Sequence, residues 1–304
     1  MKYDILIVGG GAAGMAAAIK ASEKGASVLL AEREADLGGV LNQCIHKGFG
    51  LTYFNEDLTG REYADRFRAK IYDRSLEIMT ESDVVSIGED RTAVIAGKDG
   101  VRKVSFDFCI LAAGCRERTI GSVFVGGTRP AGVYTAGEAQ KMINLGHYDL
   151  GGRFVILGSG NVGQIMARRL KILGKDVAAM VEQNGTPGGL PANRRDCIEA
   201  YEIPLILRST VDMIYGGDRV SAVRVKNLDT GNTEIIGCDA VITALGLIPD
   251  RELVQSLNKN GEYPDWLRFG GNCESVHDIV DGVTRQGERL ALDICNLMEE
   301  RRNA

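Results

Sequence analysis

The stretch Tyr3-Asp-Ile-Leu-Ile-Val-Gly-Gly-Gly-Ala-Ala-Gly14 decides the fold of this chain. Its continuous apolar run is typical of a strand buried on both faces, and an alanine-rich helix follows as far as Lys24. After Gly25 a second apolar run, residues 28–31, ends at Glu32. The order of strand, glycine-rich turn, helix and strand predicts a βαβ unit with parallel strands.

The same order occurs a second time, beginning with Arg153-Phe-Val-Ile-Leu-Gly-Ser-Gly-Asn-Val-Gly163. A helix to Leu173, an apolar run over residues 177–181 and then Glu182 follow this stretch. The glycines of the two copies correspond at a constant separation of 149 positions. They are Gly9, Gly11, Gly14 and Gly25 in the first copy and Gly158, Gly160, Gly163 and Gly174 in the second. Two equivalent βαβ units are therefore predicted.

Each copy carries the pattern GxGxxG between a buried strand and a helix, which is the context in which the pattern indicates a dinucleotide site. The first glycine permits a tight turn, the second lets the backbone approach a pyrophosphate, and the third lets helix and strand pack closely. Free N–H groups at the start of the helix attract the diphosphate. An acid at the end of the second strand, Glu32 or Glu182, can accept hydrogen bonds from the adenosine ribose.

The two acids differ in their spacing from the strand before them. Glu32 follows Val28 by four residues, whereas Glu182 follows Val177 by five, so Val181 is predicted to stand where Glu32 stands. A shift of one residue along a strand reverses the face to which a side chain points. The role of Glu182 is therefore left open by the sequence.

Length and composition exclude several classes of function. The 304 residues suffice for two domains, and a formal net charge of −5 argues against a partner that is nucleic acid or an anionic membrane. Seven cysteines without a CxxC pair, with only three histidines, argue against a disulfide scaffold or a metal site. Glycines interrupt the apolar residues 5–19, so we expect no membrane span and a cytoplasmic protein.

Further elements are predicted between and after the two copies. In the first copy they are an amphipathic helix from Leu58 to Arg74, a hairpin of Thr92–Ala96 and Val101–Val104, and a buried strand Cys109–Ala113 that stops at Gly114. In the second copy they are strands at 211–215, 220–226 and around Ile235, and a buried strand 240–243 before Leu245-Gly246. A helix from about His277 to Arg301 is predicted last.

These features resemble the flavoprotein superfamily with two dinucleotide-binding domains, which includes thioredoxin reductase and the disulfide reductases. The matching signatures beyond the glycine turns are Ala112-Ala-Gly114, Ala244-Leu-Gly246 with Pro249, and Phe269-Gly-Gly-Asn272. The resemblance implies an α/β protein with two Rossmann-like three-layer domains, in the thioredoxin reductase layout without a dimerisation domain. It implies a discontinuous FAD domain of residues 1–117 and 249–304, and an inserted NAD(P) domain of residues 118–248.

A closer resemblance is to a bacterial branch of FAD-dependent oxidoreductases found beside anaerobic glycerol-3-phosphate dehydrogenase-like flavoproteins. More remotely, the chain resembles subunits of hydrogen cyanide synthase and of opine or amino-acid dehydrogenases. The strings that carry this resemblance are Gly38–His46, Gly114–Arg118, Gly127–Gly137 and Val276–Asp281. Because such relatives act inside multi-subunit flavin complexes, the resemblance implies a second flavoprotein or iron–sulfur subunit as partner, and it leaves an oligomer open. We expect that partner to dock near residues 44–54 and 266–272.

The resemblance also implies the residues that contact each cofactor. For FAD they are Gly9, Gly11, Ala13, Gly14, Glu32, Arg33, Gly39, Val84, Ala113, Gly114, Gly271, Asn272 and His277. For NAD they are Gly158, Gly160, Asn161, Val162, Gly163, Glu182 and Gly246. Two departures stand out. Asn272 replaces the usual aspartate that holds the ribityl chain, and the short segment 250–268 is expected to leave the flavin site more open.

Cys44 and His46 are the candidate catalytic residues. The stretch Gly38–Ile45 is similar to the disulfide-reductase redox motif with its first cysteine missing, so Cys44 would be the sulfur on the flavin side. A thiolate there would be favoured by a helix N-terminus or by a protonated His46. A small buried residue without a redox role is the competing interpretation, as is a merely structural histidine.

The sequence therefore predicts hydride transfer between NAD(H) and FAD, followed by delivery of electrons to an acceptor. NADH is expected to bind in preference to NADPH, because Glu182 would repel a 2′-phosphate and no arginine follows in Gln183-Asn184-Gly185. Two alternatives stay open. One is a single-cysteine enzyme similar to NADH peroxidase or coenzyme A-disulfide reductase, which uses Cys44. The other is a cofactor-holding subunit with a degenerate second nucleotide site.

Overall fold

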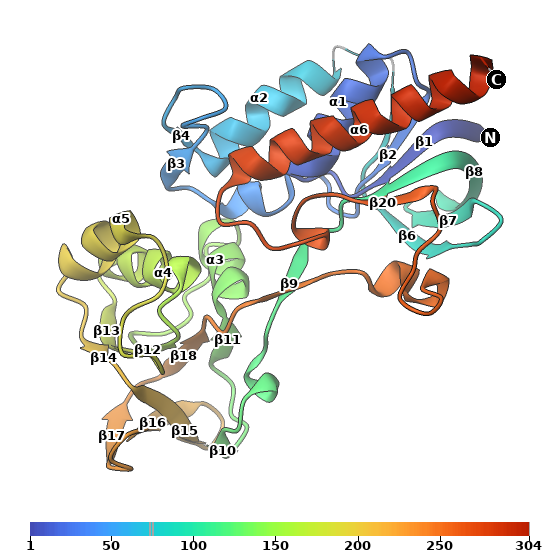
Figure 1. The fold of residues 1–304 in the computed structure, drawn as a ribbon. Coiled ribbons are helices and arrows are strands. Elements are labelled where there is room, and N and C mark those ends of the chain that lie inside the picture. Colours follow the sequence, from blue (N-terminus) through green and yellow to red (C-terminus); the bar gives the residue numbers. More distant parts are fainter. Residues whose placement is uncertain (73, 75, 304) are drawn as a thin grey trace. The chain divides into compact units, whose positions relative to one another are not determined.

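The chain divides into two compact units, which we describe from a computed structural model of residues 1–72, 74 and 76–303 (Figure 1). The first unit consists of Met1–Arg116 and Pro249–Ala304, and the second of Glu117–Ile248. Two short strands, β9 (Cys115–Glu117) and β19 (Leu247–Pro249), lie where the chain passes from one unit to the other.

The first unit is built on one sheet with the strand order β5-β2-β1-β8-β7-β6, and β20 pairs with β8. Its strands are β1 (Lys2–Val8), β2 (Val28–Ala31), β5 (Glu77–Met79), β6 (Ser82–Ile87), β7 (Thr92–Gly97), β8 (Gly100–Leu111) and β20 (Leu267–Phe269). The central strand β1 runs parallel to β2 and to β8. Ile5, Leu6 and Ile7 are fully buried, as the continuous apolar run predicts.

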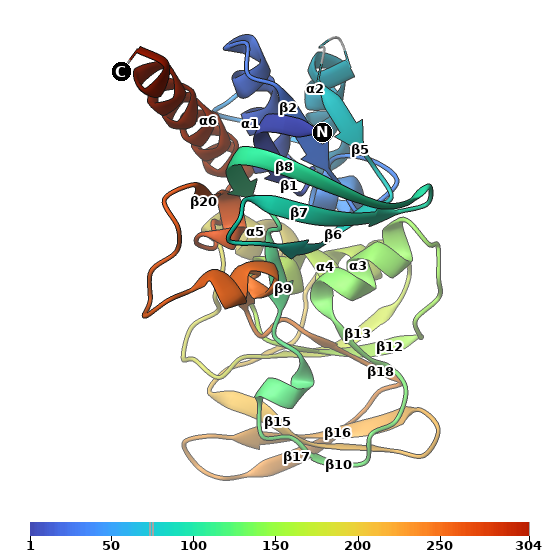
Figure 2. The same cartoon turned by 90° about the vertical axis from the view of Figure 1, so that its right-hand side faces the viewer.

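Three helices, α1 (Ala12–Glu23), α2 (Gly60–Tyr72) and α6 (Val280–Asn303), lie on one side of this sheet. The strands β7 and β6 continue the sheet beyond β8, away from these helices, as Figure 2 shows. Helices α1 and α6 approach closely because Gly287 has no side chain. A Cβ atom at that position would stand 2.2 Å from the carbonyl oxygen of Ala13.

Shorter elements complete the first unit. They are β3 (Lys47–Phe49) paired with β4 (Leu58–Thr59), and 3₁₀ turns at Gly39–Gln43, Glu252–Leu257 and Gly271–Cys273. Among the residues described here, no helix is long and apolar enough to cross a membrane.

The second unit has a parallel sheet in the order β11-β18-β12-β13-β14 and a second sheet in the order β10-β15-β16-β17. The parallel strands are β11 (Val133–Thr135), β12 (Arg153–Leu157), β13 (Asp176–Val181), β14 (Leu205–Ile206) and β18 (Ala240–Thr243). The other strands are β10 (Gly126–Gly127), β15 (Ser209–Gly216), β16 (Val220–Asn227) and β17 (Thr233–Gly237). The helices are α3 (Ala136–Asn144), α4 (Asn161–Ile172) and α5 (Pro191–Asn193), with a π-helical turn at Arg194–Glu199 and a 3₁₀ turn at Ile120–Ser122.

A β-bulge removes the shift that the spacing of Glu182 predicts. Phe154 pairs with Val177, but the next residue, Val155, pairs with Ala179, so Ala178 is the extra residue. By the end of the strands Leu157 lies opposite Val181, as Val8 lies opposite Ala31 in the first unit. The prediction that Val181 replaces Glu32 is therefore wrong, and Glu182 directly follows its strand as Glu32 does.

Three predicted boundaries also differ from the structure. Helix α2 begins at Gly60 rather than Leu58, because Thr59 and Glu62 form reciprocal side-chain to backbone hydrogen bonds that cap it. The hairpin strand and the buried strand that we predicted separately are one strand, β8, whose first half pairs with β7 and whose last residues pair with β20. Helix α6 begins at Val280, three residues after His277.

Candidate nucleotide-binding sites

The first glycine turn joins β1 to α1, and each glycine has its own reason to lack a side chain. At Gly9 the backbone has φ +101°, and a Cβ would stand 2.5 Å from the carbonyl oxygen of Ala112. At Gly14 a Cβ would stand 1.9 Å from the carbonyl oxygen of Gly9. At Gly11 a Cβ would meet no atom of the described chain within 4 Å. The space beside Gly11, at the N-terminus of α1, therefore fits a diphosphate.

Glu32 holds the turn from the end of β2. Its side chain is buried, with 5% of its surface exposed. Oε2 accepts the N–H of Gly10 at 2.6 Å, and Oε1 accepts the N–H of Glu34 at 2.8 Å. One acceptor position on each carboxylate oxygen therefore remains for another donor, such as a ribose hydroxyl.

The loop at Gly38-Gly39 folds over this turn. The N–H of Gly38 donates to the carbonyl oxygen of Gly10 at 2.8 Å. Gly39 has φ +54°, and a Cβ there would stand 3.3 Å from Cα of Gly11. The predicted contact residues Gly11 and Gly39 are thus brought together.

The ends of β8 and β20 bring further predicted residues to the same turn. Ala113 is exposed and Gly114 has φ +78° directly after β8. Gly271 has φ +67°, donates its N–H to Oε1 of Gln286 at 2.8 Å, and lies against Ala13. Residues from the start and the end of the chain therefore line one edge of the sheet, at the carboxyl ends of parallel strands.

Asn272 and His277 contact each other beside Gly271. The side-chain oxygen of Asn272 accepts the backbone N–H of His277 at 2.9 Å, and its Nδ2 donates to Sγ of Cys115 at 3.6 Å. Nδ1 of His277 lies 2.6 Å from the carbonyl oxygen of Ser275. His277 therefore belongs to the turn that precedes α6 rather than to its first turn.

Arg33 and Val84 are the predicted FAD residues on the segments next to Glu32. The exposed Arg33 directly follows Glu32. The half-buried Val84 packs against the core from β6. Its strand is held near Glu32 by a hydrogen bond from the N–H of Ser82 to the carbonyl oxygen of Glu32, at 2.9 Å.

Cys44 follows the 3₁₀ turn Gly39–Gln43, and its carbonyl oxygen accepts the N–H of Gly60, the first residue of α2, at 2.8 Å. Its thiol donates to the carbonyl oxygen of Val40 at 3.3 Å. Burial raises the pKa of the Cys44 thiol to about 12. His46 is half-buried, with Nδ1 2.9 Å from the carbonyl oxygen of Lys47 and its ring against Phe49. The N-terminus of α2 therefore lies beside Cys44, but burial opposes a thiolate at this position.

The second glycine turn, between β12 and α4, repeats the geometry of the first. Gly158 has φ +99°, and a Cβ there would stand 2.3 Å from the carbonyl oxygen of Ala244. At Gly163 a Cβ would stand 2.8 Å from the carbonyl oxygen of Gly158, while at Gly160 it would meet no described atom within 4 Å. The second unit therefore also offers space at a helix N-terminus for a diphosphate.

Glu182 is buried beside this turn and accepts hydrogen bonds from Ser159 and Asn184. Burial acts to raise the pKa of the carboxyl, but these hydrogen bonds outweigh it and the pKa lies below its ordinary value. Glu182 is thus ionised at neutral pH.

The remaining predicted residues of the second site lie around the same turn. Oδ1 of Asn161 accepts the N–H of Leu190 at 2.7 Å, and Val162 packs against the core. Gly246 has φ +99° after β18, and its carbonyl oxygen accepts the N–H of Arg118 at 2.9 Å.

Gly188-Gly189 was not among the predicted residues, yet it repeats Gly38-Gly39. The N–H of Gly188 donates to Oγ of Ser159 at 2.8 Å, and Gly189 has φ +75°. The two pairs lie 150 positions apart, one more than the glycines of the turns, because Ala178 adds a residue. That spacing is the signal in the sequence that could have identified this loop.

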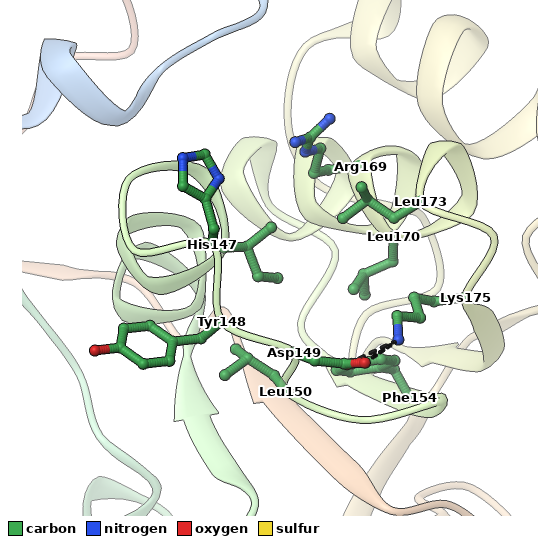
Figure 3. Close-up of a pocket in the computed structure, with 10 residues that line it drawn as sticks. His147, Tyr148, Asp149, Leu150, Phe154, Arg169, Leu170, Leu173 and Lys175 are labelled. Atoms are coloured by element: carbon green, nitrogen blue, oxygen red, sulfur yellow. Dashed lines mark hydrogen bonds and ion pairs between the residues drawn. The ribbon is translucent and has the colours of Figure 1, made fainter.

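A separate cavity of about 310 Å³ lies in the second unit near the start of β12 and the end of α4 (Figure 3). Phe154, Leu170 and Leu173 line it, and Lys175 forms an ion pair with Asp149 at its rim, with the two atoms 2.7 Å apart. The glycine turn follows the opposite end of β12 and precedes α4. This cavity is therefore not the nucleotide site.

Comparison with known proteins agrees with this geometry. Residues 3–263 match the family described as pyridine nucleotide-disulphide oxidoreductase. The thioredoxin reductase of Treponema pallidum is 26% identical over 94% of this chain and 88% of its own. The hydrogen cyanide synthase subunit HcnB of Pseudomonas protegens is 33% identical over 60% of this chain, but the matched part is only 39% of that protein.

The solved structure of T. acidophilum thioredoxin reductase superposes with a TM-score of 0.77, at 21% identity, over 97% of this chain and 98% of that one. This likeness confirms the predicted fold class of two Rossmann-like units. The family match confirms the resemblance to the two-domain flavoproteins, and the family depends on FAD and NAD(P). The branch beside glycerol-3-phosphate dehydrogenase-like flavoproteins stays a prediction. The protein belongs to the pyridine nucleotide-disulphide oxidoreductase family and is an oxidoreductase.

Proposed function

We propose that the protein carries FAD in its first unit, accepts a hydride from NADH at its second unit, and delivers electrons to a partner protein. The observation that supports this most is the repetition of one geometry in both units. In each, the second glycine faces open space at a helix N-terminus and a buried glutamate supports the turn from the next strand.

In the first unit the chain's own residues are placed to hold FAD. The N–H groups at the start of α1, beside Gly11, would bind the diphosphate, and Glu32 would accept the ribose hydroxyls. Asn272 would meet the ribityl chain with an amide where relatives have a carboxylate, which supplies a hydrogen bond without a charge. When bound, FAD supplies the hydride and electron chemistry.

The geometry around Cys44 does not favour the single-cysteine alternative. With a thiol pKa of about 12, the side chain stays protonated at neutral pH and is a poor nucleophile. Delivery of electrons away from the flavin, rather than through a cysteine of this chain, is therefore the better-supported route.

The proposal of a partner rests on exposed apolar side chains from segments that meet at the first unit's site. Val40, Ile45, Leu51, Val276 and Ile279 are exposed by 40% or more. The loop at Leu51 is joined to the start of α6 by Asp281, which follows Ile279 closely. Trp266 and Leu267 are buried, whereas Arg268, Phe269 and Asn272 are half-buried, so the docking near residues 266–272 stays a prediction, to which we add Val276 and Ile279. One relative, HcnB, is itself named as a subunit.

NADH rather than NADPH is proposed because the ionised Glu182 would repel a 2′-phosphate. One observation opposes this preference. The guanidinium of Arg208 lies beside Gly185, 3.1 Å from where a Cβ would stand. The sequence prediction considered only the three residues after Glu182, so it did not include Arg208. Arg208 also forms an exposed ion pair with Asp229, with the two atoms 3.1 Å apart. The cytoplasmic location and the possible oligomer remain predictions.

The experiment that tests the proposal is anaerobic mixing of the purified flavoprotein with NADH. We expect the visible absorbance of the flavin to be lost without a partner present, and to return on addition of an artificial electron acceptor. A protein that binds FAD but is never reduced by NADH or NADPH would contradict the proposed hydride transfer and favour a subunit that only holds its cofactor.

A further inference from the structure

The two units differ at the two positions whose backbone N–H groups support the glutamate. Gly10 and Glu34 of the first unit correspond to Ser159 and Asn184 of the second. In the first unit the backbone N–H groups of these residues donate to the carboxylate. In the second unit their side chains contact it as well.

Glu32 has acceptor positions to spare. Within the described chain it accepts two hydrogen bonds, one on each oxygen, from the N–H groups of Gly10 and Glu34. A carboxylate offers about four lone-pair positions. The two that remain match the two hydroxyl groups of a ribose.

Each carboxylate oxygen of Glu182 already accepts two hydrogen bonds. Oε2 accepts the N–H of Ser159 at 3.0 Å and its hydroxyl at 2.7 Å. Oε1 accepts the N–H of Asn184 at 2.9 Å and its side-chain Nδ2 at 2.8 Å. The Ser159 hydroxyl and the Asn184 amide therefore take the positions that remain available on Glu32.

Further hydrogen bonds connect Ser159 to the loop at Gly188-Gly189. The Ser159 hydroxyl also accepts the N–H of Gly188 at 2.8 Å. Nε2 of the buried Gln164 donates to the carbonyl oxygens of Ser159 at 2.7 Å and Gly188 at 2.6 Å. Met15, which is apolar, holds the corresponding place in the first unit. Turning the Ser159 hydroxyl away from Glu182 therefore also disturbs the contact with Gly188.

We infer that Ser159 and Asn184 compete with the adenosine ribose for the carboxylate of Glu182 and thereby set the affinity of the second site for its nucleotide. This inference rests on the proposed function, because it assumes that the second unit binds a nicotinamide nucleotide. Binding requires the Ser159 hydroxyl and the Asn184 amide to leave Glu182, so the nucleotide binds more weakly than the glycine turn alone would allow.

The test is calorimetric titration of the FAD-loaded protein with ADP-ribose, which has the diphosphate and adenosine ribose but cannot reduce the flavin. The variants are Ser159→Ala, Asn184→Ala and the double substitution, with Ser221→Ala on the exposed face of β16 as control. Asn184 is exposed, so its substitution tests the inference even if the buried Ser159→Ala variant does not fold. We expect Asn184→Ala and Ser159→Ala each to bind about threefold to tenfold more tightly than the parent, and the control to be unchanged.

Equal or weaker binding of ADP-ribose by Asn184→Ala would overturn the inference. So would a failure of both the parent and the variants to bind. The proposed function is decided separately, by whether NADH reduces the flavin of the parent protein. If NADH reduces the flavin but the variants bind ADP-ribose with the affinity of the parent, only the inferred competition at Glu182 is refuted. If NADH does not reduce the flavin, the proposed hydride transfer itself is refuted.

Discussion

Asp281 joins the first turn of α6 to the loop at Thr52: its Oδ2 accepts both the backbone N–H and the hydroxyl of Thr52, each at 2.8 Å. The same carboxylate accepts the N–H groups of Gly50 and Tyr53, and the residue is only 1% exposed. Arg285, one turn further along α6, donates to the carbonyl oxygen of Thr52. This loop is therefore held by the last helix of the chain.

Asp281→Ala should destabilise the first unit, because it leaves several backbone donors of the loop without a partner. We expect a cost of about 3 kcal/mol, seen as a fall of roughly 5–10 °C in the unfolding temperature. Differential scanning calorimetry measures this. Asp293→Ala, at an exposed position of the same helix, should leave the temperature within about 1 °C of the parent.

Gly11→Val and Gly14→Val should fail in different ways. A side chain at Gly11 enters open space where the diphosphate would lie, so we expect a folded protein that lacks FAD. A side chain at Gly14 collides with the backbone at Gly9, so we expect a protein that does not fold. Flavin absorbance and circular dichroism separate the two outcomes. A Gly11→Val variant with a full complement of FAD would remove this turn as the flavin site.

Cys44→Ser should leave FAD content and reduction by NADH largely unchanged. With a pKa of about 12, the thiol has its charged form only as the pH rises toward that value, so about one thiol in ten thousand is ionised at pH 8. Alkylation of Cys44 by iodoacetamide, followed by peptide mass spectrometry, should therefore be slow at pH 8 and faster with each unit of rising pH. Rapid labelling at pH 7, or loss of peroxide or disulfide reduction in Cys44→Ser, would favour the single-cysteine mechanism.

Anaerobic titration of the flavin with both nucleotides should show tighter binding of NADH than of NADPH. Arg208→Gln tests the one guanidinium near Gly185, and we expect it to leave NADH binding unchanged. Tighter binding of NADPH by the parent protein, lost in Arg208→Gln, would assign Arg208 to the 2′-phosphate and reverse the proposed preference.

The fold was predictable because the glycine turns and the buried strands are local patterns that appear twice. Gly9, Gly14 and Glu32 act on neighbours that the motif itself specifies, so their surroundings follow from sequence spacing. The bulge at Ala178 was not predictable in this way. Whether an extra residue forms a bulge depends on how the strand pairs with its neighbour β12, and the sequence of β13 alone does not show that pairing.

Other features of the site depend on contacts between distant segments. Arg208 reaches Gly185 from just after β14, the parallel neighbour of β13. The burial of Cys44 depends on Gly60, whose Cβ would stand 2.6 Å from that of the cysteine. Trp266 belongs to a stretch that we expected near a docking partner, but its own ring packs against Phe106 with ring centres 5.5 Å apart. In each case the packing partner lies too far along the chain for a local pattern to indicate it.

The discontinuity of the first unit fixes the order in which the chain can fold as it is synthesised. The second unit, residues 117–248, leaves the ribosome before the segments that complete the first. Gly271, β20 and α6 are made after the second unit, yet Gly271 and Gly287 pack against Ala13 beside the first glycine turn. The first unit therefore cannot close around a flavin until α6 has been made, and until β20 is made the strand β8 lacks its pairing on that side.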